Sequence, residues 1–192
     1  FAGDIFKSTD DGATWNTSRS GSGQRVEIAV APSDNNYVYA LVNVGSEVNN
    51  VLKSTDAGNT WTNEPAPKYT NINNCTESTQ SFARGQAWYD LIMIVQPNDR
   101  DKLIVGGVDL HRSEDGAASW ESISSWTGTC DSYLHADHHA LISRPGFPNE
   151  IVSGNDGGVG YSSTAFVTGS NPSFNIQNDN YNVTQFYACA VH

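Results

Sequence analysis

An all-β fold is predicted by three features of this 192-residue sequence. Residues that favour turns are abundant, with 17 glycines and many Ser, Thr and Asn residues. Short apolar runs alternate with these turn-rich stretches, which is typical of a chain with many short strands. An eight-residue motif also recurs along the chain, and this recurrence predicts a repeated structural unit.

The motif reads Ser-x-Asp-x-Gly-x-Thr-Trp and occurs at Ser8–Trp15 and Ser54–Trp61. A third copy, Ser113–Trp120, has its glycine one place early, and a fourth near Ser162 has lost the Asp and the Trp. The copies start at residues 8, 54, 113 and 162, so the intervals are 46, 59 and 49 residues. Periods of roughly 40–50 residues are typical of the blades of a propeller.

The motif has the chemistry of a tight hairpin turn. Its Asp carboxylate can accept hydrogen bonds from backbone amides that follow, and its Gly can adopt a positive φ. The Trp begins the next strand and is expected to pack between neighbouring repeats. We therefore assign structural rather than catalytic roles to the motif residues Ser8, Asp10, Gly12, Trp15, Ser54, Asp56, Gly58, Trp61, Ser113, Asp115 and Trp120.

Each repeat is predicted to contain four strands. The first strand is apolar and ends at a proline-led turn, the third runs into the motif, and the Trp opens the fourth. The first two strands of successive repeats are Val26–Pro32 with Tyr37–Val42, Leu91–Pro97 with Lys102–Gly106, and Ala140–Pro145 with Glu150–Gly154. Four-stranded antiparallel blades around a channel form a β-propeller, whereas the long regular period argues against a flat sandwich.

Residues 1–192 are expected to be part of one propeller domain, with about three full blades and partial blades at both ends. Propellers close with roughly 4–8 blades, so the remainder is expected from sequence beyond this segment. The chain starts at Phe1 rather than Met, which indicates a start after a processing site or inside a longer protein.

Composition narrows the classes of partner. The net charge of −11 repels phosphate backbones and argues against nucleic-acid binding, but it suits Ca²⁺ or a basic partner. No apolar run is long enough to span a membrane. Cys75 and Cys130 lie in long polar loops, and a bridge between them would suit an oxidising compartment, but the sequence leaves the pairing of the three cysteines open. Cys189 is expected to be buried in a strand or paired outside the segment.

The motif resembles the Asp-box, or bacterial neuraminidase, repeats of sialidases, xyloglucan-active hydrolases and sortilin-type propellers. Longer stretches are similar to the large secreted bacterial Asp-box proteins known as glycosyl hydrolase or sortilin-like proteins. These stretches are Gly85–Asp90, His135–Ala140, Gly154–Gly158 and Thr184–Tyr187. The resemblance covers almost the whole chain. It implies a β-propeller and a secreted or cell-surface location, but it does not imply one activity.

Residues just before the first strand of each blade are expected at the mouth of the channel. Alignment on the prolines that end these strands makes Arg25, Asp90 and His138 equivalent, and pairs Tyr89 with Asp137. The predicted ligand-binding residues at this mouth are Arg25, Trp88, Tyr89, His138 and Gln185.

A metal site is one hypothesis for the histidine-rich segment. On a strand, His135, Asp137 and His139 would share one face and offer ligands for a divalent ion such as Zn²⁺ or Ca²⁺. On a straight strand they would spread over about 14 Å, so one ion would need the chain to turn. The alternative is a hydrogen-bonded His/Asp network, and no cofactor is assigned.

Catalysis is a second hypothesis. Resemblance to xyloglucan-active hydrolases, which carry an Asp beside paired glycines, implies that Asp156 is an acid or base. Glycoside hydrolysis needs two carboxyl groups, and Asp90 or Asp137 is the candidate for the second. The alternative is a glycine-rich turn capped by Asp156.

Three functions therefore remain open. The first is a binding or adhesion propeller for a glycan or protein ligand at the channel mouth. The second is a xyloglucanase-like glycoside hydrolase, and the third is a structural module of a surface assembly. Exposure of Trp88 and Trp126 would favour sugar binding by stacking, whereas their burial between blades would favour the structural role.

Overall fold

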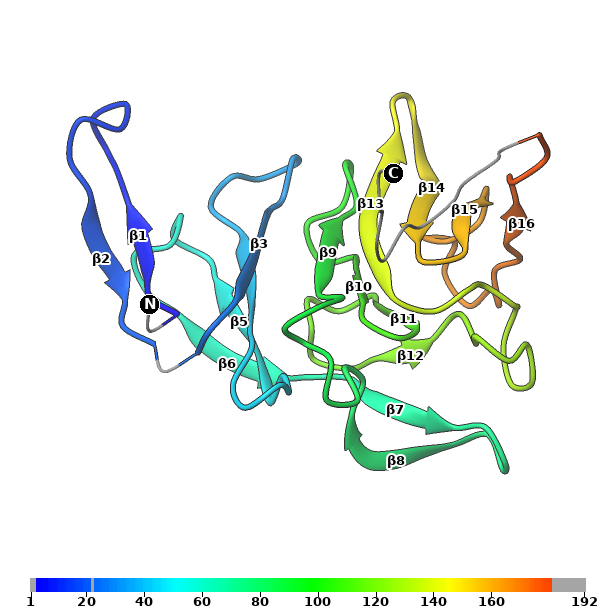
Figure 1. Ribbon diagram of the computed structural model, residues 1–192. Coiled ribbons are helices and arrows are strands. Elements are labelled where there is room, and N and C mark those ends of the chain that lie inside the picture. Colours follow the sequence, from blue (N-terminus) through cyan, green and yellow to red (C-terminus); the bar gives the residue numbers. More distant parts are fainter. Residues whose placement is uncertain (1–2, 22, 181–192) are drawn as a thin grey trace, which may run out of the picture.

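The computed structural model describes residues 3–21 and 23–180, and every regular element in these ranges is a β-strand (Figure 1). Blade 1 comprises β1 (Ile5–Lys7) and β2 (Asn16–Arg19). Blade 2 comprises β3 (Val26–Val30), β4 (Val38–Val42), β5 (Asn50–Ser54) and β6 (Thr62–Pro65). Blade 3 comprises β9 (Ile92–Val95), β10 (Leu103–Gly106), β11 (Leu110–Ser113) and β12 (Glu121–Ser122). Blade 4 comprises β13 (His138–Arg144), β14 (Phe147–Asn155), β15 (Gly158–Ser162) and β16 (Asn175–Ile176).

Each four-stranded blade is an antiparallel meander whose strands pair in sequence order. The first strands of the blades lie against one another, because β9 contacts both β3 and β13 (Figure 1). These strands therefore face the channel, as the repeats predict. The predicted all-β propeller fold is confirmed. The expected partial blade at the C-terminal end falls on residues 181–192, which lie outside the described residues.

Buried apolar side chains fill the spaces between blades rather than a single central core. One cluster, which includes Tyr39 and Leu103, lies between blades 2 and 3. A second, which includes Ile104 and Phe166, lies between blades 3 and 4. The short apolar strands thus bury both faces of a blade against its neighbours, which explains their near-continuous apolar sequences.

The turn motif forms the same hydrogen bonds in three copies. In blade 2, the Ser54 hydroxyl and the Thr60 amide each donate to Asp56 over 2.8 Å, and the Gly58 amide donates to the Ser54 hydroxyl. Equivalent bonds surround Asp10 and Asp115. Because these hydrogen bonds join residues of the same turn, they stabilise that turn rather than contacts between blades.

The displaced glycine of the third copy has a simple explanation. Two consecutive residues of each turn have positive φ, at 57° and 77° for Ala57 and Gly58, and at 72° and 74° for Gly116 and Ala117. Glycine adopts a positive φ without strain at either position, so the glycine can move by one residue without changing the turn.

Two of the motif tryptophans join neighbouring blades, as expected. The Trp61 indole donates to the Ser18 hydroxyl of blade 1, and the Trp120 indole donates to the Pro65 carbonyl of blade 2. Trp15 differs, since it bonds within its own turn and is 62% exposed. Among the described residues, no blade precedes blade 1 to cover it.

The long interval of 59 residues reflects an inserted hairpin between blades 2 and 3. Its strands are β7 (Lys68–Asn71) and β8 (Thr76–Ser81), and it projects away from the blades (Figure 1). Cys75, beside its turn, forms a disulfide with Cys130, which lies in the loop between β12 and β13, so the structure settles the pairing that the sequence left open. Cys189 lies outside the described residues. The described residues contain no helix that could span a membrane.

Candidate ligand-binding rim

The aligned residues before the inner strands come together at one end of the channel. Arg25, just before β3, donates from its guanidinium to the carbonyls of Tyr89 and Leu91, each over 2.6 Å. His138, at the start of β13, donates its amide to the Gly107 carbonyl of blade 3. Arg25 therefore positions the loop that leads into β9 rather than presenting a free cation.

An exposed hydrogen-bond network joins blades 3 and 4 at this end. The Tyr89 hydroxyl donates to both oxygens of Asp156, at 2.9 and 3.1 Å. His139 Nε2 lies 2.9 Å from Asp156 Oδ1, and the rings of Tyr89 and His139 meet edge to face at 4.7 Å. Two of the predicted site residues, Tyr89 and Asp156, are thus in direct contact.

The turn around Asp156 differs from the predicted one. Asn155, not Asp156, caps the β14–β15 turn, because its side-chain oxygen accepts the Gly157 amide at 3.0 Å. The Asp156 carboxylate is therefore left to face Tyr89 and His139. A Cβ on Gly157 would lie 2.2 Å from the His135 ring, so glycine is required at this close approach.

The predicted metal ligands His135, Asp137 and His139 do not share one face of a strand. Asp137 has a positive φ of 64° and β13 starts only at His138, so the two-residue alternation does not extend through the segment. His135 Nδ1 contacts the Ala136 carbonyl, whereas Asp137 accepts a hydrogen bond from Gln86. Within residues 3–21 and 23–180, no three His, Cys, Asp or Glu side chains gather closely enough to hold a metal ion. Among the described residues, only His139 of the two histidines forms a hydrogen bond with an Asp carboxylate, that of Asp156.

Asp90 and His138 lie beneath the rim instead of on it. Asp90 has no exposed surface, and in the described part of the chain neither carboxylate oxygen has a hydrogen-bond partner. Burial, aided by the nearby Asp137 carboxylate, raises the pKa of Asp90 to about 7. The buried His138 forms a hydrogen bond of 2.7 Å with the Ser153 hydroxyl. Burial, and to a smaller extent the charge of the neighbouring His139, lowers the pKa of His138 to about 3. His138 is therefore neutral at physiological pH.

Trp88 extends the rim with a broad aromatic surface. Its side chain is 60% exposed, and its ring lies 5.5 Å from that of Tyr89. Trp88, Tyr89 and His139 thus form a continuous run of rings beside the Asp156 carboxylate. The remaining predicted rim residue, Gln185, lies outside the described residues.

Comparison with known proteins places this architecture in a family. The family model described as Sortilin, neurotensin receptor 3 matches residues 3–189. The chain belongs to the Sortilin-Vps10 family. A search of curated protein sequences found no match.

The structure of a GH74 enzyme supports the propeller fold of this Sortilin-Vps10 chain. A GH74 enzyme of Niastella koreensis is 20% identical, with a TM-score of 0.57 over 91% of this chain and 26% of the enzyme. YCF48 bound to D1 peptide is 14% identical, with a TM-score of 0.49 over 84% of this chain and 44% of that protein. The chain therefore spans about a quarter of the length of the GH74 enzyme.

One feature of the Sortilin-Vps10 chain was missed by reasoning from its sequence. A pocket of about 270 Å³ lies beside the rim and is lined by Arg84, Gln86, Val108, Trp126, Ala136 and Asp137. The exposed tryptophan was the available signal, but no local motif pairs Trp126 with Arg84. Only the folded chain brings together these residues from loops of blade 3 and the loop before blade 4.

Proposed function

We propose that this Sortilin-Vps10 propeller binds a glycan at the rim formed by Trp88, Tyr89, His139 and Asp156. The main observation behind this proposal is that the Trp88 side chain is 60% exposed and lies beside Tyr89, which is hydrogen-bonded to Asp156. Sugar rings present C–H faces that stack on aromatic side chains, and their hydroxyls pair with carboxylates and phenols. A rim with both surfaces side by side suits this ligand class.

Two further observations support a secreted or cell-surface binding role. The Cys75–Cys130 disulfide is suited to an oxidising compartment. Trp126 is also exposed, at 41%, whereas a structural module would bury such rings between blades. We propose the Asp-box turns as the rigid scaffold that holds these loops.

Glycoside hydrolysis is the second candidate, and one observation favours it. The raised pKa of Asp90, close to the Asp137 carboxylate, resembles the pairing of a protonated and an ionised carboxyl group in hydrolases. However, Asp90 has no exposed surface, and a general acid must reach the glycosidic oxygen. Asp156 is in turn hydrogen-bonded to Tyr89 and His139. Binding without hydrolysis is therefore the function that the geometry supports best.

The test is a glycan array followed by calorimetric titration with xyloglucan oligosaccharides and cellohexaose. We expect measurable binding that Trp88→Ala weakens about tenfold, because a stacking surface is lost. Trp15→Ala is the matched control, since Trp15 is equally exposed but lies in the blade 1 turn. Its affinity should equal that of the wild type.

Two outcomes would contradict the binding proposal. Absence of binding to every glycan by correctly folded protein would rule out the rim as a glycan site. Release of new reducing ends from xyloglucan, abolished in Asp90→Asn, would instead identify a hydrolase.

A further inference from the structure

We infer that a second sugar-binding pocket lies beside the rim, between Arg84 and Trp126, and that the Cys75–Cys130 disulfide holds its two walls together. The inference rests on the proposed glycan-binding function, and it names residues and a ligand class outside the rim. The pocket holds about 270 Å³. This is near the lower limit of small-molecule sites, about 300–1,000 Å³, so it suits a single sugar ring.

The first wall of the pocket is Arg84, at the end of the inserted hairpin. Its guanidinium lies over the Tyr69 ring of β7, 4.2 Å from the ring centroid. Arg84 has a positive φ of 48°, in a turn closed by the Gln86 amide on the Ala83 carbonyl. Such a conformation is uncommon for a residue with a Cβ and is often found at binding sites. The hairpin therefore determines where the guanidinium points.

The second wall is Trp126, in the loop between β12 and β13. Its amide donates to the buried Asp109 carboxylate over 2.7 Å, which anchors the start of the loop to blade 3. The loop is closed on itself, because the Ser125 amide donates to the Ser132 carbonyl over 2.9 Å. The Trp126 ring remains 41% exposed and lines the pocket.

The polar groups between the walls favour an uncharged sugar. Gln86 and Asp137 line the pocket and are joined by a hydrogen bond of 3.3 Å. Arg84 offers only donors, the Asp137 carboxylate only acceptors, and Gln86 offers both, which together match the hydroxyls of a sugar. An acidic sugar would bring its carboxylate close to Asp137 as well as to Arg84, so the attraction and the repulsion offset each other and a negative charge gains nothing over a neutral hydroxyl.

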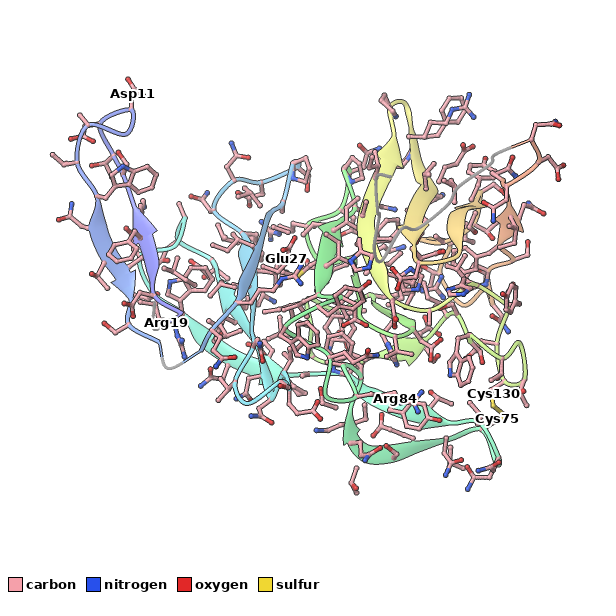
Figure 2. The ribbon with its side chains drawn as sticks, in the orientation of Figure 1. Asp11, Arg19, Glu27, Cys75, Arg84 and Cys130 are labelled. Carbon is pink, nitrogen blue, oxygen red and sulfur yellow. A yellow bond between two sulfur atoms is a disulfide. The ribbon has the colours of Figure 1, made fainter. Side chains whose placement is uncertain are left out.

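The disulfide joins the two elements that form the walls. Cys75 lies on the hairpin that carries Tyr69, the support of Arg84, and Cys130 lies on the loop that carries Trp126. Figure 2 shows the disulfide at the far end of the β7–β8 hairpin, with Arg84 closer to the blades. Cleavage of this link frees the hairpin and the loop to separate, so the disulfide is a positioning element of the pocket.

The experiment compares wild-type protein with Trp126→Ala and with the double variant Cys75→Ser/Cys130→Ser. Each is titrated with xyloglucan oligosaccharides, cellohexaose and, as the acidic probe, oligogalacturonate. We expect each variant to weaken binding of the neutral probes about 5- to 10-fold. Trp126→Ala in the disulfide-free background should add little, because both changes act on the same pocket. Tyr133→Ala, an exposed aromatic of the same loop outside the pocket lining, should bind as the wild type does.

The outcomes separate this inference from the proposed function. Unchanged affinity in Trp126→Ala, together with weakened binding in Trp88→Ala, would overturn the pocket and leave the rim. The reverse result would overturn the rim and leave the pocket. Tighter binding of oligogalacturonate than of the neutral probes would contradict the ligand class, and full affinity of the disulfide-free protein would contradict the positioning role. If the disulfide-free variant fails to fold, Trp126→Ala still decides the pocket.

Discussion

Tyr89 donates its phenolic hydrogen to Asp156, a residue 67 positions further along the chain, over 2.9 Å. Tyr89 lies in the loop that leads into β9, and Asp156 lies in the β14–β15 turn. The bond therefore joins blades 3 and 4 beside the exposed Trp88. It orients the carboxylate that, in the proposed function, meets a sugar hydroxyl.

Tyr89→Phe is expected to weaken glycan binding about 3- to 10-fold, because Asp156 loses one of its hydrogen-bond partners. Calorimetric titration with xyloglucan oligosaccharides measures the change. Tyr161→Phe is the matched control, since Tyr161 also donates to a carboxylate, that of Glu150, but away from the rim. Equal affinities of the two variants would show that the Tyr89 hydroxyl plays no part in binding.

The raised pKa of Asp90 predicts a pH-dependent stability. Between the ordinary value of 3.8 and about 7, the folded protein keeps a proton that the unfolded chain has lost. The free energy of unfolding contributed by this group therefore falls as pH rises through that window. Asp90→Asn, which cannot ionise, should be more stable than the wild type by about 1–3 kcal/mol at pH 8 and nearly equal to it at pH 4. Urea denaturation from pH 4 to pH 8 tests this, and a pH-independent difference would disprove it.

Ser54→Ala should reduce the free energy of unfolding by about 1–3 kcal/mol. The buried Ser54 hydroxyl donates to Asp56 and accepts the Gly58 amide, so alanine removes the acceptor of the Gly58 amide and one of the donors to Asp56. Ser8 makes the same bonds in an exposed turn, where water can replace them. Ser8→Ala should therefore have a smaller effect in the same denaturation measurement, and the reverse order would contradict this account of the turn.

Arg112→Lys should destabilise the protein by about 2–4 kcal/mol. The fully buried guanidinium of Arg112 donates to the carbonyls of Ala165, Val167 and Ser170 and so ties blade 3 to the segment after β15. A lysine ammonium cannot reach all three acceptors with the same geometry. Chemical denaturation measures the loss. Lys102→Met removes an exposed hydrogen bond to Thr168 in the same segment and should have a smaller effect, so an equal or larger loss there would argue against the role of Arg112.

Much of the blade structure was predictable because its signals are local. The Ser54 to Thr60 turn closes through bonds that span two to four residues, so the spacing of its side chains is enough to identify it. The equivalence of Arg25, Asp90 and His138 also followed from strand spacing. All three lie at or within two residues of the start of an inner strand, as the alignment on the prolines predicts.

The detailed geometry of the site was less predictable. The positive φ of Asp137 ends the alternation that grouped it with His135 and His139, and no sequence rule assigns that angle to an Asp. Asn155 caps the β14–β15 turn instead of Asp156. The sequence did not distinguish them, because Asn and Asp side chains can both accept such a hydrogen bond.

The repeat, the strand order and the turns could be read from the amino-acid sequence, whereas the pairing of Cys75 with Cys130 could not. The first three depend on interactions within one blade or on the residue types themselves. Which side chains are accessible depends on the folded arrangement of the blades. This arrangement buries Asp90, exposes Trp88 and brings Arg84 and Trp126 together across a pocket. Burial and close approach depend on packing between blades and loops, and residues far apart in the chain determine that packing.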